Sequence, residues 1–441
     1  MNRRILSLAL PNIITNITVP LLGLVDTAIV GHLDTQGSSL DYIGAIAVGT
    51  MIINFIYWNF GFLRMGTSGF TAQSFGKRDL RESIHILTRA LLIAIIISIG
   101  LILLQYPIAL LARQFIENKN EVLDLAIRYF LIVVWAAPAT LGMYAIKGWL
   151  IGMQDSKTPM YIAIIINIMN IVLSLFFVLK LNMKIEGVAL GTVLSQYIGL
   201  IAVVIIWFAR YSKLKKYFNL RASLDIIKMK EFFRVNSDIF LRTTCLILVT
   251  TYFTIASSKM EYPLLAVNAI LMQLFTLFSY FMDGFAYASE SLCGRYYGAK
   301  DNRNLKKSVK YILVWGLGIS IVFMNLYYFF GQNLIGLLTD QEHVLEATKP
   351  YMIWVLLIPI TGFVAFLYDG ILIGMTKTEI MRNAIFIATA AFFLLYFLLQ
   401  PLLGNTALWI SFISYLLGRS IFMAILSHKS IFGKSNENST R

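Results

Sequence analysis

The stretch Lys147-Gly-Trp-Leu-Ile-Gly-Met153 returns 222 residues later as Asp369-Gly-Ile-Leu-Ile-Gly-Met375, with five of the seven positions identical. At the same shift, the segment 73–79 (QSFGKRD) falls on 295–301 (RYYGAKD) and shares with it a glycine and the final aspartate. Two matches at one offset indicate an internal repeat, as found in many transporters. The chain is therefore expected to consist of two related halves.

The composition of this 441-residue chain is typical of a membrane protein. Hydrophobic residues make up 58% and charged residues 14%, and the mean hydropathy is +0.73. Soluble domains average roughly 45–50% apolar and about 25% charged residues, because their surfaces must face water. The net charge of +14 comes from short basic clusters between apolar runs. Nucleic-acid binding needs basic residues gathered on one face, so no such partner is expected.

Twelve segments are long and apolar enough to cross about 30 Å of hydrocarbon as helices of roughly 20 residues. They cover 5–33, 41–63, 84–112, 122–146, 158–180, 186–209, 235–258, 262–289, 308–338, 346–368, 380–402 and 406–427. Six spans per repeat is an even number, so both repeats enter the membrane in the same direction. We therefore expect an all-α polytopic membrane protein with twelve transmembrane helices in two pseudo-symmetric six-helix lobes.

The expected lobes cover residues 1–210 and 235–429, with a basic cytoplasmic linker at 211–234 and a cytoplasmic tail at 430–441. The linker is interpreted as a solvated connection close to anionic lipid headgroups. Two lobes that rock about a shared site favour a carrier, since channels more often arrange identical subunits around a pore.

The sequence offers no pattern typical of an enzyme, a cofactor site or a metal site. The four histidines are widely separated, and Cys245 and Cys293 lie in or beside apolar runs. Neither an H-E-x-x-H helix nor a phosphate-binding loop is present in the sequence. We therefore predict a transporter, not an enzyme, that works without a cofactor and draws on an ion gradient.

Asp26 is the acid placed deepest in an apolar span, about seven residues or 10 Å from its outer end. A charge inside lipid costs roughly 2.5–3.5 kcal/mol and is a functional candidate by default. Burial favours the neutral form of a carboxyl group, so this residue can load and release a proton. A structural acid bonded to Asn or Thr neighbours is the alternative.

Other charges lie within the spans or at their ends: Arg64, Asp238, Arg242, Asp283, Glu290, Asp369 and Arg419. Asp238 and Arg242 are four residues apart, which predicts an ion pair along one helix. Asp283 and Glu290 share a helix face, where gating and pairing with basic loop residues are both open. Asp369 is expected to be structural. Arg64 and Arg419 are expected to snorkel or to pair between lobes.

Backbone and amide features mark two further spans. Pro11 and Pro20 interrupt the first span, and proline weakens the helical hydrogen-bond ladder, so this helix can bend. In the fifth span Asn167 and Asn170 lie on one face with Ser174 one turn further. These polar groups are either functional or serve as contacts between helices.

Several motifs resemble the multidrug and toxic compound extrusion (MATE) family, and more narrowly its DNA-damage-inducible F (DinF-like) branch. They are 25–33 (VDTAIVGHL), 60–73 (FGFLRMGTSGFTAQ), 236–242 (NSDIFLR), 266–269 (AVNA), 282–290 (MDGFAYASE) and 369–376 (DGILIGMT), followed by 381–383 (MRN). They lie in both halves of the chain.

The resemblance implies a central cavity open alternately to each side and export of organic, often cationic, compounds against proton or sodium entry. It implies that Asp26 is the proton-coupling site, that Pro11 bends the first helix, and that Asn170 and Thr192 are partners of Asp26. Many relatives carry a second aspartate where this chain has Ser174. A two-carboxylate mechanism is therefore not expected.

Three alternatives stay open at this stage: a flippase for a lipid-linked precursor, sodium coupling in place of proton coupling, and a passive channel or receptor. The chain is expected to act as a monomer in the bacterial inner membrane, surrounded by lipid and handling small organic molecules.

Orientation follows from the basic residues. With both termini in the cytoplasm, the expected cytoplasmic segments hold 26 Lys and Arg residues and the outer segments hold seven. Cytoplasmic loops carry the excess of Lys and Arg in membrane proteins. Reporters fused after residue 429 or within 213–230 should therefore be cytoplasmic, and reporters within 36–40 or 341–346 should be external. A reporter in the central loop that reads as external contradicts the twelve-span map.

Overall fold

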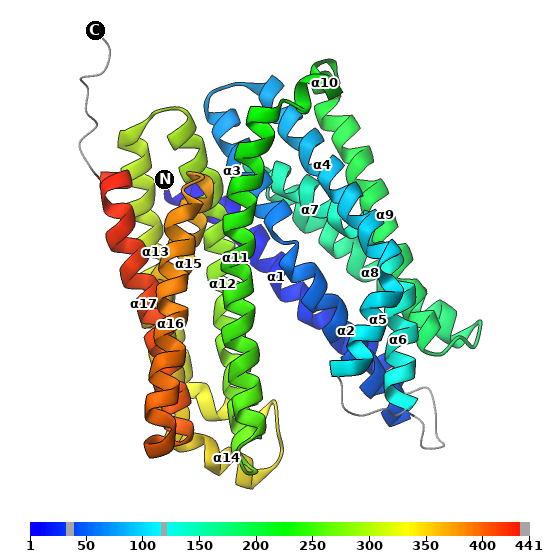
Figure 1. Ribbon diagram of the computed structural model, residues 1–441, viewed down its shortest axis with the longest axis vertical. Coiled ribbons are helices and arrows are strands. Elements are labelled where there is room, and N and C mark those ends of the chain that lie inside the picture. Colours follow the sequence, from blue (N-terminus) through cyan, green and yellow to red (C-terminus); the bar gives the residue numbers. More distant parts are fainter. Residues whose placement is uncertain (32–38, 116–120, 433–441) are drawn as a thin grey trace. The chain divides into compact units, whose positions relative to one another are not determined.

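The computed structural model describes residues 1–31, 39–115 and 121–432 of the chain. In this part every regular element is a helix (Figure 1). The side chains of Pro20 and Asp26 and the tail from residue 433 onward lie outside the described part. Eleven described stretches are long and apolar enough to cross a membrane, and they coincide with the second to twelfth expected spans. The expected all-α polytopic fold is confirmed.

The elements of the first half are α1 Asn2–Gly31, α2 Ser39–Asn59, α3 Phe62–Gly76, α4 Leu80–Leu103, α5 Gln105–Phe115, α6 Glu121–Val133, η1 Val134–Ala136, α7 Ala137–Gly152, α8 Lys157–Leu179, α9 Ile185–Tyr211, η2 Ser212–Tyr217 and α10 Leu220–Ser223. Those of the second half are α11 Ile226–Ser258, α12 Leu264–Gly298, α13 Asn302–Gly336, α14 Glu342–Thr348, η3 Lys349–Tyr351, α15 Met352–Gly374, α16 Thr378–Leu403 and α17 Asn405–Phe432. In both halves η denotes a 3₁₀ helix.

Four spans expected to be continuous are interrupted. The second divides after Asn59 into α2 and α3, and the tenth runs from α14 through the 3₁₀ turn η3 into α15. The third divides at Leu104 into α4 and α5, and the fourth divides at the 3₁₀ turn η1 into α6 and α7. In the third and fourth spans the helix after the break has a proline in its first turn, Pro107 in α5 and Pro138 in α7. Proline lacks the N–H group and its ring collides with the preceding turn, so a helix more readily starts at proline than continues through it.

The helices group into two compact units, called here the N-unit (Ile14–Asn236) and the C-unit (Met1–Ile13 with Ser237–Arg441). The first turns of α1 belong to the C-unit, whereas the expected lobes were divided at residues 210 and 235. The stretch expected to be a solvated linker belongs to the N-unit. Its Ser223 is buried and its carbonyl oxygen accepts a hydrogen bond from Nε of Arg89 in α4 at 2.6 Å. The linker is therefore anchored to α4 through buried polar contacts.

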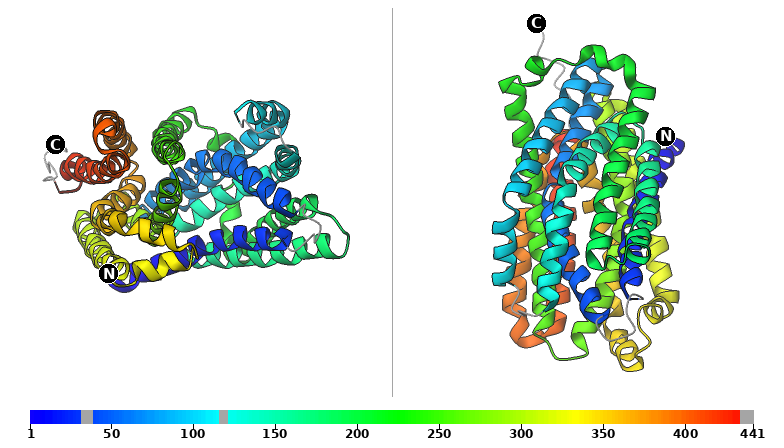
Figure 2. Two further views of the ribbon diagram at one scale, coloured as in Figure 1. Left: turned by 90° about the horizontal axis from the view of Figure 1, so that it is seen from below. Right: turned by 90° about the vertical axis from the view of Figure 1, so that its right-hand side faces the viewer.

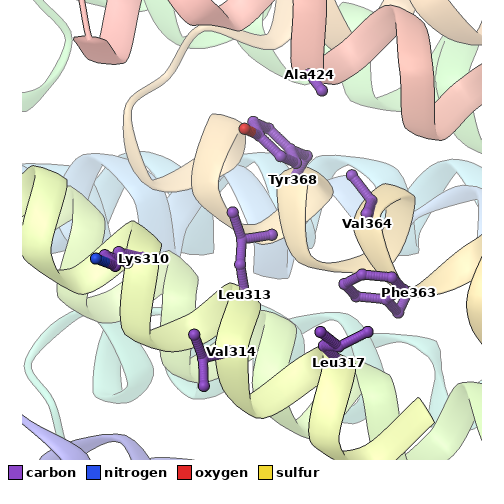
Figure 3. A pocket seen from close by; sticks show the side chains of 8 residues that line it. All are labelled: Lys310, Leu313, Val314, Leu317, Phe363, Val364, Tyr368 and Ala424. Carbon is purple, nitrogen blue, oxygen red and sulfur yellow. The ribbon is translucent and has the colours of Figure 1, made fainter. Parts of the chain in front are cut away.

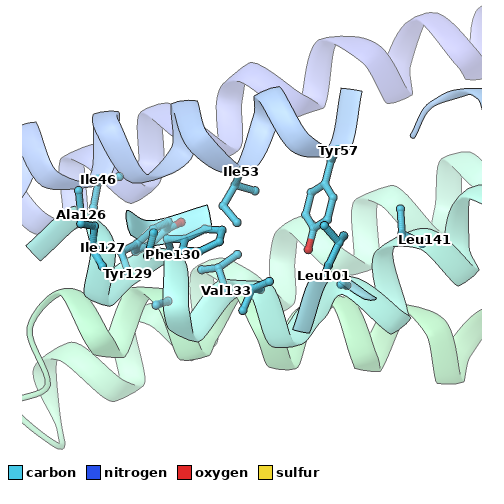
Figure 4. Packing of buried hydrophobic residues seen from close by; sticks show 14 of the residues in the cluster. Ile46, Ile53, Tyr57, Leu101, Ala126, Ile127, Tyr129, Phe130, Val133 and Leu141 are labelled. Carbon is cyan, nitrogen blue, oxygen red and sulfur yellow. The ribbon is translucent and has the colours of Figure 1, made fainter. Parts of the chain in front are cut away.

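The N-unit has an apolar core between α2, α4, α6 and α7. Ile53 and Tyr57 of α2 point toward Phe130 and Val133 of α6, with Leu101 of α4 beside them (Figure 4). α8 packs along α9, and α3 packs along α7. In the C-unit α15 lies against α12, α13 and α17, and α16 runs beside α17 (Figures 1 and 2).

A close helix contact recurs in both halves. In the N-unit a Cβ atom placed on Gly148 of α7 would lie 2.3 Å from the carbonyl oxygen of Arg64 in α3. In the C-unit a Cβ atom on Gly370 of α15 would lie 2.1 Å from the carbonyl oxygen of Ala286 in α12. Both the glycines and their contacts are separated by 222 residues. The sequence repeat therefore corresponds to a repeated three-dimensional contact.

The turns that follow α3 and α12 also match. Asp79 and Asp301 cap α4 and α13, and each carboxylate accepts a hydrogen bond from the backbone N–H three residues later, at 2.9 and 3.0 Å. The residues before them, Arg78 and Lys300, both have a positive φ of 60° and 57°. Aspartate is a favoured N-cap because it satisfies an unpaired N–H group of the first helical turn. These turns explain the recurrence of aspartate in both halves.

The glycine contacts generate a prediction. A Cβ atom on Gly374 would lie 2.3 Å from the carbonyl oxygen of Glu290, whereas one on Gly318 of α13 would meet nothing within 4 Å. We expect Gly374→Ala to lower the stability of the detergent-solubilised protein by about 1–3 kcal/mol, because backbone atoms must move apart. Gly318→Ala should be neutral or slightly stabilising, because alanine is the better helix former. Thermal unfolding of both variants checks this, and equal melting temperatures would contradict it.

Candidate functional site

The N-unit holds a buried polar cluster between α8 and α9. Asn170 of α8 is fully buried, and its Nδ2 donates a hydrogen bond to Oγ1 of Thr192 in α9 at 3.0 Å. Thr192 Oγ1 in turn donates to the carbonyl oxygen of Val188 at 3.1 Å. The structure therefore brings together Asn170 and Thr192, the two residues that the family resemblance implied as partners of Asp26.

Two polar atoms of this cluster have hydrogen-bonding capacity left over. Neither Oδ1 of Asn170 nor Oγ of Ser174 has a partner among the described side chains, and both residues are fully buried. Ser174 sits tightly against α9, since a Cβ atom on Gly191 would lie 2.4 Å from its Oγ. A buried polar atom without a partner costs roughly 1–3 kcal/mol. The two atoms lie one helical turn apart and can receive a further polar group.

α1 passes along the same side of α8. Nδ2 of Asn167 donates a hydrogen bond to the carbonyl oxygen of Thr18 in α1 at 3.2 Å. Asp26 lies eight residues beyond Thr18, and Ser174 lies seven beyond Asn167, which is about 12 and 10 Å along their helices. Spans one and five cross in the same direction. The backbone of α1 therefore carries Asp26 to about the depth of Ser174.

The C-unit contains a buried cluster of charges. One carboxylate oxygen of Asp369 accepts hydrogen bonds from Arg242 of α11 and from Arg419 of α17, the latter at 2.8 Å. Their exposed fractions are 4%, 8% and 1%. The Arg419 guanidinium also lies over the Tyr415 ring, 5.4 Å from its centroid. Burying an ion is costly unless it is paired, so this cluster joins three helices.

The expected pairing of Asp238 with Arg242 along α11 is wrong. Asp238 accepts hydrogen bonds from Arg382 at 2.6 Å and from the Thr378 hydroxyl at 2.9 Å, both on α16. Arg242 pairs with Asp369 on α15 instead. Exposed pairs along a helix contribute only about 0.2–0.5 kcal/mol. Neighbouring helices here offer buried, better-aligned partners.

Arg419 also departs from its expected role. It neither snorkels to the membrane surface nor pairs between lobes, because its partner Asp369 belongs to the same C-unit. Arg64 is partly buried in α3, and Glu290 is almost fully buried in α12. Asp283 is partly buried on the same helix. The roles suggested for these three residues stay predictions.

A further buried network was missed by the sequence reasoning. Nδ2 of Asn268 in α12 donates to Oδ1 of Asn405 at 2.7 Å and to Oγ of Ser257 at 2.9 Å. Its Oδ1 accepts hydrogen bonds from Asn405 Nδ2 and from Trp409 Nε1 at 3.1 and 2.9 Å. The available signal was an amide inside an apolar span, but its partner lies 137 residues away. All the bonding capacity of the Asn268 side chain is used within the C-unit, which is typical of a structural contact.

Among the described residues, no three His, Cys, Asp or Glu side chains converge as metal ligands. Two of the polar centres described above differ in their chemistry. One consists of neutral amides and hydroxyls beside α1, and the other consists of arginines and aspartates in compact ion pairs.

Two repeated helical units with polar groups buried inside membrane-crossing helices define a polytopic membrane transporter. The MatE family model matches residues 11–176 and 239–402, once on each half. The chain belongs to the MatE family. The suspected family membership is thereby confirmed.

Similar proteins extend over nearly the whole chain. The chain is 36% identical over 430 residues to "DNA damage-inducible protein F" of Escherichia coli, covering 95% of this chain and 90% of that protein. It is 25% identical over 449 residues to "Multidrug and toxin extrusion protein 1" of Danio rerio, covering 98% of this chain and 73% of the relative. It is also 24% identical to the chloroplastic protein DETOXIFICATION 45 of Arabidopsis thaliana, over 96% and 77% of the two chains.

Solved structures share the fold. A crystal structure of MATE in the bent conformation matches with a TM-score of 0.82 at 19% identity, covering 98% of this chain and 95% of that one. A eukaryotic MATE transporter matches with a TM-score of 0.84 at 15% identity, over 96% and 95% of the two chains. These likenesses establish the architecture of twelve helices in two lobes.

The charge cluster generates a prediction. Asp369→Asn leaves two buried arginines without their carboxylate, so we expect it to destabilise the protein by about 3–5 kcal/mol. Asp124 of α6 provides a matched control, because it pairs with Arg113 at 2.7 Å but both side chains are more than half exposed. Asp124→Asn should cost at most about 1 kcal/mol. Thermal unfolding in detergent measures both, and a melting temperature of Asp369→Asn equal to that of the control would contradict the structural role.

Proposed function

We propose that this chain is a secondary active antiporter that exports organic, often cationic, compounds in exchange for protons by alternating access. Its similarity to proteins whose names refer to multidrug and toxin extrusion supports the export of such compounds. The similarity to a bacterial relative over 95% of the chain supports the inner membrane as its location. In this proposal it works as a monomer and without a cofactor, with both termini in the cytoplasm.

Asp26 is the proposed proton-coupling residue, and the Asn170–Ser174 cluster is the observation that carries the proposal. Asn170 Oδ1 and Ser174 Oγ are buried with bonding capacity left over, on the side of α8 that contacts α1. A protonated carboxyl group can donate to either atom, whereas the ionised form can accept from the Ser174 hydroxyl. The cluster thus suits a carboxyl group that alternates between two protonation states.

The arrangement of acids in the seventh and tenth spans supports a proton over sodium. The segments 239–258 and 351–368 of the seventh and tenth spans contain no Asp or Glu. Asp369 and Asp238, just outside these segments, are held by arginines. Sodium prefers several oxygen ligands at once, whereas a proton needs only one carboxylate, which it neutralises. In this proposal the paired acids of the C-unit fix its helices and leave coupling to the N-unit.

The driving force follows from charge movement. Each proton that enters gains about 2.3 kcal/mol per 100 mV of membrane potential, together with the contribution of the pH gradient. Exchange of one proton for one monovalent cation moves no net charge. Export of such a compound is then driven by the pH gradient alone.

The first test is Asp26→Asn, which mimics the protonated state and cannot cycle. Efflux driven by a pH gradient should fall to background, while the purified protein keeps the melting temperature of the wild type. Asp124→Asn makes the same chemical change at an exposed ion pair and should transport normally. Efflux by Asp26→Asn at the wild-type rate would end the proposal that this residue couples the proton.

The second test separates proton from sodium coupling. Everted vesicles are given, on their outer side, a dye or drug from a panel active in a pump-deficient bacterial host, and its accumulation in the lumen is followed while each gradient is imposed alone. We expect transport with a pH gradient and none with a sodium gradient. Transport that follows sodium and ignores pH would show that the coupling ion is sodium.

A further inference from the structure

The C-unit carries an open apolar groove between α13, α15 and α17, with a volume of about 530 Å³ (Figure 3). This volume lies within the range of roughly 300–1,000 Å³ that is typical of small-molecule sites. A single charged side chain, at one end of the groove, contributes to the lining. Its lining includes Lys310, Leu313, Val314 and Leu317 of α13, Phe363 of α15 and Ala424 of α17.

The floor of the groove is closely packed, and its α13 wall is exposed. A Cβ atom on Gly316 of α13 would lie 2.3 Å from Cδ1 of Leu367 and 3.2 Å from Cδ2 of Phe363, both on α15. Val314 and Leu317 are 61% and 43% exposed. The helices therefore hold a fixed apolar surface that an external molecule can reach.

The lining of α13 continues as a basic stripe toward the N-terminus of the helix. Positions 310, 313, 314 and 317 follow the spacing of one helix face, and positions 303, 306, 307 and 310 repeat it. The latter are Arg303, Lys306, Lys307 and Lys310, of which Arg303, Lys307 and Lys310 are exposed. One face of α13 thus changes from cationic to apolar at Lys310, at the helix end expected to be cytoplasmic.

We propose that this groove binds an anionic phospholipid, with an acyl chain along Val314 and Leu317 and the phosphate beside Lys310 and Lys307. A zwitterionic lipid should bind less tightly, because its own positive group is repelled by the basic stripe. A free anion should also bind less tightly, because it has no acyl chain to contact the apolar groove. Basic pockets between membrane helices bind anionic headgroups, with about 1 kcal/mol from each basic residue near the surface. The proposal does not depend on what the chain exports or on its coupling ion.

The headgroup part is tested by native mass spectrometry of the full chain, delipidated in detergent and titrated with phosphatidylglycerol or phosphatidylcholine. We expect phosphatidylglycerol to bind more tightly. Lys307→Gln with Lys310→Gln should weaken its binding by about five-fold for each lysine, with no change for phosphatidylcholine. The matched control replaces Lys213 and Lys215 of η2 with Gln, which should leave binding unchanged. Equal affinity for the two lipids, or an equal effect of both double variants, overturns the proposal.

The acyl-chain part is tested by filling the groove. Val314→Trp places a large side chain on the exposed wall, while Val322→Trp makes the same change on α13 outside the lining, at a residue that is 64% exposed. Phosphatidylglycerol bound to Val314→Trp should fall at least five-fold, and Val322→Trp should bind as the wild type does. Unchanged binding by Val314→Trp overturns the site. If Val314→Trp abolishes a dimer of the chain while phosphatidylglycerol still binds, the groove belongs to a second copy of the chain. If it abolishes dye binding while phosphatidylglycerol still binds, the groove belongs to the exported substrate.

Discussion

Close backbone contact between two helices in each half is the constraint on which the rest of the structure depends. In the N-unit α7 approaches α3 at Gly148, and in the C-unit α15 approaches α12 at Gly370. Lipid is as apolar as a leucine side chain, so helices in a membrane associate through tight packing at small residues. Asp369 stands next to Gly370, and this contact fixes the part of α15 that presents Asp369 to Arg242 and Arg419.

Each unit buries both charged and neutral polar groups, since Arg89 of the N-unit is buried and pairs with Glu82, and the C-unit holds the amides of Asn268 and Asn405. In the C-unit, arginines hold Asp238 and Asp369, so these carboxylates are neutralised within the unit itself. In the N-unit the contact between α8 and α9 carries the neutral side chains of Asn170, Ser174 and Thr192. A charge inside lipid is retained only where it is paired or functional. The two C-unit acids are thus fixed in ion pairs, whereas Asn170 Oδ1 and Ser174 Oγ of the N-unit keep hydrogen-bonding capacity among the described residues.

Much of the fold could be predicted from the sequence, because hydrophobic length and the repeat offset are local properties of the chain. Apolar length alone predicts continuous third and fourth spans, whereas Pro107 and Pro138 mark the interruptions at Leu104 and η1. The site was predicted in part. Asn170 followed from an amide in an apolar span, whereas the ion pairs of Arg242 and Arg419 could not be read from spacing.

The sequence by itself determined that the chain is helical, that it crosses a membrane, and that its halves repeat at 222 residues. Chain composition sets these properties, because lipid admits only apolar surfaces with internally bonded backbones. Only the tertiary structure determined which buried carboxylate pairs with which arginine. Asp369 meets Arg242 across 127 residues and Arg419 across 50. Such partners are chosen by the packing of whole helices, and no local pattern encodes that choice.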